Sequence, residues 1–105
     1  RLSCIIDANA VPVLPGAWEA ADAFLYTAAG QRNRNHTGPF VRFVDVPFPM
    51  EEILFDPQTS GGLLLAAAPQ DADALEAALQ AAGLPAKIVG EITAKQEPEI
   101  TVIYK

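Results

Sequence analysis

A turn that runs directly into an apolar segment constrains the fold of this chain more than any other stretch. Residues 54–65 read Leu-Phe-Asp-Pro-Gln-Thr-Ser-Gly-Gly-Leu-Leu-Leu, and we call residues 56–62 within them the 56–62 loop. The Asp56 carboxylate can accept hydrogen bonds from backbone N–H groups two residues further on, and Pro57 fixes φ near the value that a turn requires. The glycines at the end of the loop lack a Cβ, so the backbone there can adopt positive φ or approach a ligand closely. This pattern predicts a tight turn that opens a buried strand.

The same loop carries groups that suit an anion. Thr59 and Ser60 offer two adjacent hydroxyls, and the following glycines allow backbone N–H groups to face a phosphate, as phosphate-binding nests do. The glycines lead into a strand-like segment and not into a helix, so the helix dipole that completes a P-loop is missing. Turn chemistry alone already explains Asp, Pro and Gly here. The residues therefore leave two interpretations open, a phosphate-binding loop and a structural turn.

Hydrophobic periodicity predicts alternating strands and helices. The expected strands are 1–6, 40–45, 63–68, 86–92 and 100–105. The expected helices are 15–28 and 69–82, with one helical turn at 50–54. Gly83 is placed to cap the second helix at its C-terminal end. Helices between strands predict a layered α/β domain.

A second loop is expected at residues 30–39. Arg32, Asn33 and Arg34 concentrate positive charge there in a chain whose net charge is -6. Guanidinium groups bind phosphate oxygens in bidentate fashion, although a solvated loop whose arginines pair with surface acids is the alternative. His36 has no Cys, His or carboxylate neighbours at metal-ligand spacing, so no metal site is expected.

Composition excludes several classes of function. The acidic balance argues against nucleic acid and anionic membranes as partners. No apolar run approaches the roughly 18 residues that indicate a membrane span, and no signal peptide is recognisable. Cys4 is the single cysteine, so it forms no internal disulfide, which fits a cytoplasmic protein, and we expect it to be a small core residue. Because the first residue is Arg, we expect a fragment of a longer protein.

Four segments together resemble the C-terminal domain of selenophosphate synthetases (selenide, water dikinases), a branch of the AIR synthase-related superfamily. The most specific is Asp-Pro-Gln-Thr-Ser-Gly-Gly-Leu-Leu at 56–64, and the others are Val-Pro-Val-Leu-Pro-Gly-Ala at 11–17, Arg-Asn-Arg at 32–34 and Gly-Glu-Ile at 90–92. The resemblance covers roughly residues 5–92. It implies an α/β (α+β) fold, with a mixed β-sheet and packed helices, in one domain spanning 1–105. By the same resemblance the chain lacks the opening helix of that domain and the N-terminal ATP-binding domain.

The resemblance also implies an activity for the intact protein. Such an enzyme is an ATP-dependent phosphotransferase that makes selenophosphate from selenide, ATP and water and releases AMP and phosphate. ATP and Mg²⁺ bind mainly to the N-terminal domain, which also carries the catalytic Cys or selenocysteine, its partner Lys and the metal-binding Asp residues. We therefore expect no catalytic residue, no metal ligand and no tightly bound cofactor in this chain, which should be inactive alone. The implied partners are its own N-terminal domain, ATP, selenide and, for the full-length enzyme, a second copy.

The contribution expected of this chain is one wall of the ATP/phosphate cleft. The candidate residues come from the two loops: Asp56, Gln58, Thr59, Ser60, Gly61 and Gly62 from one, and Arg32, Asn33 and Arg34 from the other. The family usually has Gly-Gly-Thr before Arg-Asn, whereas this chain has Ala-Ala-Gly-Gln at 28–31, which is a departure in the second loop. Two alternatives stay open: another ATP-using AIR synthase relative, such as a thiamine monophosphate kinase or a hydrogenase-maturation protein, and a stand-alone small-ligand or interaction module.

Overall fold

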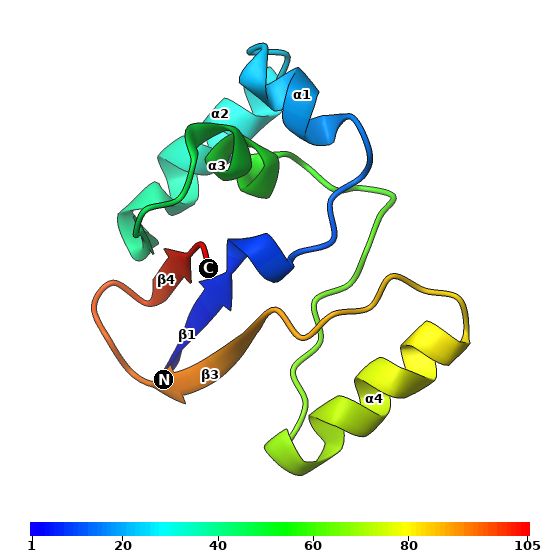
Figure 1. Cartoon of the computed structure of the whole chain (residues 1–105). Helices are drawn as coiled ribbons and strands as arrows, with labels where there is room; N and C mark the ends of the chain where they lie inside the picture. The colour runs from blue at the N-terminus through cyan, green and yellow to red at the C-terminus, as the bar shows by residue number, and fades with distance from the viewer.

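The computed structural model describes all of residues 1–105 and contains a mixed four-stranded sheet with four helices (Figure 1). The strands are β1 (Leu2–Asp7), β2 (Val41–Phe43), β3 (Gly90–Ala94) and β4 (Ile100–Ile103). The helices are α1 (Ala17–Asp22), α2 (Ala28–Thr37), α3 (Phe48–Phe55) and α4 (Pro69–Ala81), with short 3₁₀ turns at Ala8–Ala10 and Gly38–Phe40. The α/β class with a mixed sheet is thus confirmed.

The strand order is β2-β4-β1-β3, with β4 parallel to both β1 and β2 and β3 antiparallel to β1. Cys4 lies opposite Ile100 on one side and Ile92 on the other. Because side chains alternate between the two faces of a sheet, these residues share one face, which we call the inner face. Its members are Cys4, Ile6, Val41, Phe43, Ile92, Ile100 and Val102.

A small core lies where α3 packs on the inner face. Ala8, Met50 and Val102 are buried together, and half-buried residues such as Trp18 and Ile53 surround them. This arrangement covers the inner face over β2 and β4. Apolar burial of this kind contributes about 25 cal/mol for each Å² removed from water, and it fixes α3 against the sheet.

The burial pattern of β1 differs from the alternation expected for it. Leu2 is exposed, Cys4 is half-buried, and Ser3 is the buried residue. The Ser3 hydroxyl accepts a hydrogen bond from the backbone N–H of Gln96 at 2.6 Å and donates to the carbonyl of Gln96 at 3.3 Å. A polar side chain is stable when buried if its hydrogen bonds are satisfied, so the segment after β3 covers Ser3 and not Leu2.

The first predicted helix is shorter than its periodicity indicated. Helix α1 ends at Asp22, and two residues later Phe24 adopts the left-handed conformation with a φ of 62°. The N–H groups of Phe24 and Leu25 then bond to the carbonyls of Ala21 and Ala20, at 3.0 and 2.8 Å. This is the Schellman arrangement that closes a helix, and it leaves the side chains of Phe24 and Leu25 exposed.

The prediction of a loop at residues 30–39 was wrong, because most of this segment is helical. Helix α2 runs from Ala28 to Thr37, and Thr27 caps its start by accepting the N–H of Gly30 at 3.0 Å. Gly and Asn have low helix propensity, which is why the sequence favoured a loop. The cap and the contacts of α2 with α3 outweigh that preference.

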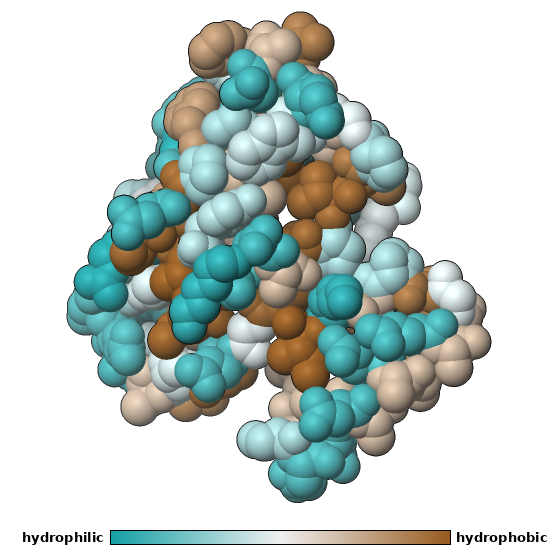
Figure 2. Space-filling model, in the orientation of Figure 1, coloured by the Kyte–Doolittle hydropathy of each residue, from teal (hydrophilic) through white to brown (hydrophobic).

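The expected buried strand at residues 63–68 was also wrong. This segment is extended but pairs with no strand, and Leu63 and Leu64 are 87% and 78% exposed. It leads to α4, and the two together stand apart from the helices on the sheet (Figure 1). An apolar cleft of about 2280 Å³ separates them from the uncovered part of the inner face, and hydrophobic surface borders that hollow in Figure 2. Apolar content favours burial, but a strand also needs a neighbouring strand to bond its backbone.

Other predictions hold with shifted bounds. Helix α4 begins at Pro69 as expected, and Gly83 ends it with a φ of 84°. The N–H of Gly83 bonds to the Gln80 carbonyl at 2.9 Å, and that of Leu84 bonds to the Leu79 carbonyl at 3.1 Å. The turn expected at 50–54 is the longer helix α3, and β2 and β4 lie within the strands expected for them. The strand expected at 86–92 was correct only for residues 90–92, because β3 runs from Gly90 to Ala94. None of the helices is long and apolar enough to cross a membrane.

Candidate functional site

The two candidate segments meet where α2 contacts the end of α3. The Thr27 hydroxyl donates to Asp56 Oδ1 at 3.1 Å while it accepts the N–H of Gly30. Almost two turns further along α2, Asn33 Nδ2 donates to the backbone carbonyl of Phe55 at 2.7 Å. Both contacts fall at the start of the 56–62 loop. The structure therefore joins Asn33 to the root of that loop.

Gly30 makes this contact close. A Cβ built on Gly30 would lie 3.7 Å from the Phe55 carbonyl oxygen and 3.8 Å from Asp56 Cα. The first turn of α2 therefore lies in van der Waals contact with the loop root, with no space for a bulky side chain at this position. The Asp56 carboxylate also stands at the N-terminal end of α2, where the helix dipole favours a negative charge.

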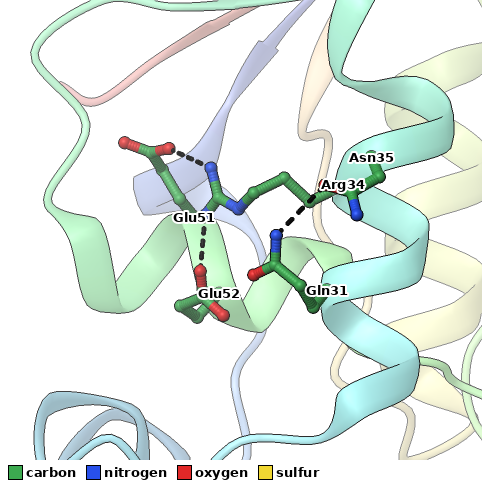
Figure 3. Close-up of polar contacts among 5 residues, drawn as sticks. All are labelled: Gln31, Arg34, Asn35, Glu51 and Glu52. Carbon is green, nitrogen blue, oxygen red and sulfur yellow. Dashed lines mark hydrogen bonds and ion pairs between the residues drawn. The ribbon is translucent and has the colours of Figure 1, made fainter.

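Arg34 faces the acids of α3. Its guanidinium donates to Glu51 Oε1 at 2.9 Å and to Glu52 Oε1 at 2.6 Å (Figure 3). It also lies over the rings of Phe48 and Phe55, at 5.4 and 4.7 Å from their centres. Arg34 is thus the counter-ion of two carboxylates, one of which, on Glu52, is buried at 3% exposure.

The environment of Arg34 raises its pKa. Burial removes solvation and lowers the pKa of the guanidinium, but the hydrogen bonds and charges of Glu51 and Glu52 together outweigh this effect. The guanidinium of Arg34 is therefore positively charged at neutral pH. Its charge is compensated by two carboxylates, which leaves little attraction for a phosphate.

Most of the 56–62 loop is exposed and forms no backbone hydrogen bond with the rest of the chain. Residues 57–62 are exposed, and the hydroxyls of Thr59 and Ser60 form none of the side-chain hydrogen bonds of the structure. Neither Gly61 nor Gly62 has a positive φ. A Cβ on Gly62 would meet no atom within 4 Å, so the backbone there is open to a ligand. The loop is thus held at its root and presents unpaired donors at its tip.

The remaining candidates are placed without partners. Arg32 is exposed on α2 and forms no ion pair, so its guanidinium is available to an anion. Gln58 is exposed, and its Oε1 lies 3.7 Å from a Cβ built on Gly61. No group of three or more His, Cys, Asp or Glu could hold a metal ion.

Sequence reasoning did not single out Thr27, Glu51 or Glu52. The signal for Thr27 was a capping residue directly before a segment that can be helical. No local signal marks the two glutamates, because their partner Arg34 is 17 and 18 residues away in the sequence.

Comparison with known proteins gives one family and a consistent set of relatives. The family described as AIR synthase related protein, C-terminal domain, matches residues 2–103. A selenide, water dikinase of Agathobacter rectalis is 51% identical over 102 residues, which are 96% of this chain and 30% of the relative. A protein of the same name from Desulfitobacterium hafniense strain Y51 is 44% identical over 84% of this chain and 26% of its own length. Another, from Treponema denticola, is 36% identical over 96% of this chain and 30% of its own length. The chain therefore spans less than a third of these relatives.

Proposed function

The chain belongs to the family of AIR synthase related protein C-terminal domains, and on that premise we propose that it is the C-terminal domain of a selenide, water dikinase. The observation that carries this proposal is the 51% identity, over 102 residues, with a relative of that name. By this proposal residues 1–105 form one domain without the family's opening helix, joined in the longer protein to an N-terminal ATP-binding domain. The parent, a cytoplasmic homodimer, makes selenophosphate from selenide, ATP and water and releases AMP and phosphate.

In this proposal the chain supplies one wall of the cleft that holds the phosphates. Phosphoryl transfer depends on positioning and on neutralising charge that spreads over phosphate oxygens. The unpaired hydroxyls of Thr59 and Ser60 and the unpaired guanidinium of Arg32 are suitable donors for such oxygens. Mg²⁺ would neutralise phosphate charge when bound, and in this proposal its ligands belong to the N-terminal domain.

Other residues near the loop have structural roles in this proposal. Asp56 accepts the Thr27 hydroxyl and orients the loop, so it is not the acid or base of the reaction. Arg34 is held by the two glutamates of α3 and is a less suitable phosphate ligand than Arg32. Without the ATP-binding domain, the 105 residues alone are inactive.

The test is phosphorus NMR of the longer natural protein with ATP, Mg²⁺ and selenide. We expect selenophosphate and AMP to appear together, and no AMP from the 105 residues alone. The double variant Thr59→Val with Ser60→Ala should lower kcat/KM by roughly 10- to 100-fold. Thr93→Val, on β3, is the matched control and should change it by less than about 2-fold. A folded longer protein that leaves ATP untouched, or produces AMP without selenophosphate, would refute the proposal and favour a relative with another substrate or a binding module.

A further inference from the structure

The 56–62 loop is anchored on one side only. No backbone hydrogen bond links residues 57–67 to any helix or strand of the structure. The anchored side is the root, formed by Phe55 at the end of α3 and by Asp56. Whatever fixes these two residues therefore fixes the direction in which the loop leaves the sheet and helices.

One side chain of α2 and the side chain of its N-cap residue hold that root. The Phe55 carbonyl belongs to the last turn of α3, where carbonyls have no partner within the helix, and Asn33 supplies the missing donor at 2.7 Å. Thr27 bonds the Asp56 carboxylate at 3.1 Å, and its own orientation is fixed because it also caps α2. Thr27 and Asn33 are six residues apart, almost two turns of α2, so the two contacts restrain both the position and the rotation of the root.

We infer that Thr27 and Asn33 are positioning residues that hold the 56–62 loop in the direction in which it presents Thr59 and Ser60. Neither residue touches the tip of the loop, and each acts through the loop root. The kinetic part of this inference rests on the proposed function, whereas the restraint on the loop does not. Small misplacement of a group that orients a phosphate has large kinetic consequences, because catalysis of this kind depends on geometry.

The chain offers matched variants on one helix. Asn33→Ala and Thr27→Val remove the two contacts. Asn35→Ala is the control, because Asn35 also accepts a side-chain hydrogen bond, from Gln31 at 3.2 Å, but makes no hydrogen bond with α3 (Figure 3). Thr27→Ser keeps the hydroxyl and should restore wild-type behaviour.

The first measurement needs no activity. Nitrogen-15 relaxation of the 105-residue chain gives order parameters for the backbone amides of Asp56 and Gln58. We expect the parameters to fall below about 0.6 in Asn33→Ala and Thr27→Val, and to stay near 0.8 in Thr27→Ser and Asn35→Ala. A merely stabilising role would lower the melting temperature and leave the local order of the folded molecules unchanged. Unchanged order in Asn33→Ala and Thr27→Val, with the fold intact by circular dichroism, overturns the inference.

The second measurement uses the longer protein and the selenophosphate assay. Asn33→Ala and Thr27→Val should lower kcat/KM by roughly 10-fold or more, and Thr27→Ser should recover it to within about 2-fold. Loss in Asn35→Ala equal to that in Asn33→Ala contradicts the inference. If the wild-type protein makes no selenophosphate, the proposed function fails, and the relaxation experiment still decides whether the loop is held by α2.

Discussion

Replacing Arg34 by Met tests whether this residue acts as an internal counter-ion. The substitution keeps an apolar stem of similar length between Phe48 and Phe55 and removes only the charged, hydrogen-bonding head. It leaves the carboxylate of Glu52, whose side chain is 3% exposed, without a cationic partner. Removing one partner of a fully buried ion pair costs about 3–5 kcal/mol.

The expected loss of stability is smaller in this protein, because the Arg34 side chain is 24% exposed and solvent screens part of the interaction. We expect a loss of about 2–3 kcal/mol in the free energy of unfolding, which includes the cation–π contacts. Since small domains have only about 5–15 kcal/mol in total, this is a large effect. Arg32→Met, on the same helix and without an ion pair, should change the stability by less than about 0.5 kcal/mol.

The assay is urea unfolding followed by circular dichroism and by the fluorescence of Trp18. The midpoint should fall in Arg34→Met while the slope m stays constant, which identifies a change in stability. A raised pKa means that the contribution of Arg34 is present below the ordinary pKa and is lost only as pH rises through the folded value, so the effect should be constant from about pH 6 to pH 9. Adding Glu52→Gln to Arg34→Met should recover part of the loss, because the buried charge is then absent.

The reasoning about Arg34 is refuted if Arg34→Met and Arg32→Met destabilise equally. It is also refuted if Glu52→Gln adds its full cost to that of Arg34→Met, since two residues that interact give a non-additive pair of substitutions. In either case the ion pair contributes nothing measurable to the contact between α2 and α3.

Two glycine substitutions test the strand pairing and the end of α4. A Cβ on Gly90 would lie 2.1 Å from the Ile5 carbonyl oxygen, so Gly90→Ala must push β3 away from β1. We expect the free energy of unfolding, measured with urea, to fall by about 2–4 kcal/mol. Gly62→Ala, with nothing within 4 Å, is the control, and an equal cost in both would show that the β1–β3 contact is not the cause. Gly83→Ala places a Cβ at a φ of 84° and should cost about 1 kcal/mol; unchanged helicity and midpoint would contradict the cap assigned to this residue.

Local signals in the sequence were sufficient for part of this structure. Helix α4 has a proline at its start, an apolar stripe along one side and a glycine just after its end. Each of these features stabilises the helix through interactions between residues that are close in the sequence. The same holds for β4, whose alternation needs no knowledge of its neighbours. The 56–64 motif was specific enough to indicate the family that the comparisons then showed.

The candidate site could be predicted only in outline. The sequence named Asn33 and Asp56 but not the contact between their segments, because that contact depends on α2 being a helix packed on α3. It treated Arg34 as a potential phosphate ligand, whereas the structure surrounds it with two carboxylates from α3. A counter-ion distant in sequence leaves no local trace, so charge alone does not distinguish a free cation from a paired one.

Periodicity and capping residues by themselves determined the α/β class and the helix α4, and the 56–64 motif indicated the family by its resemblance. Only the tertiary structure decided that residues 28–37 are helical, that Ser3 is buried in place of Leu2, and that residues 63–68 lack a paired strand. The physical reason is the range of the interactions concerned. Caps and periodicity act over three or four residues, whereas strand pairing and burial depend on segments that are distant in sequence and brought together by the fold.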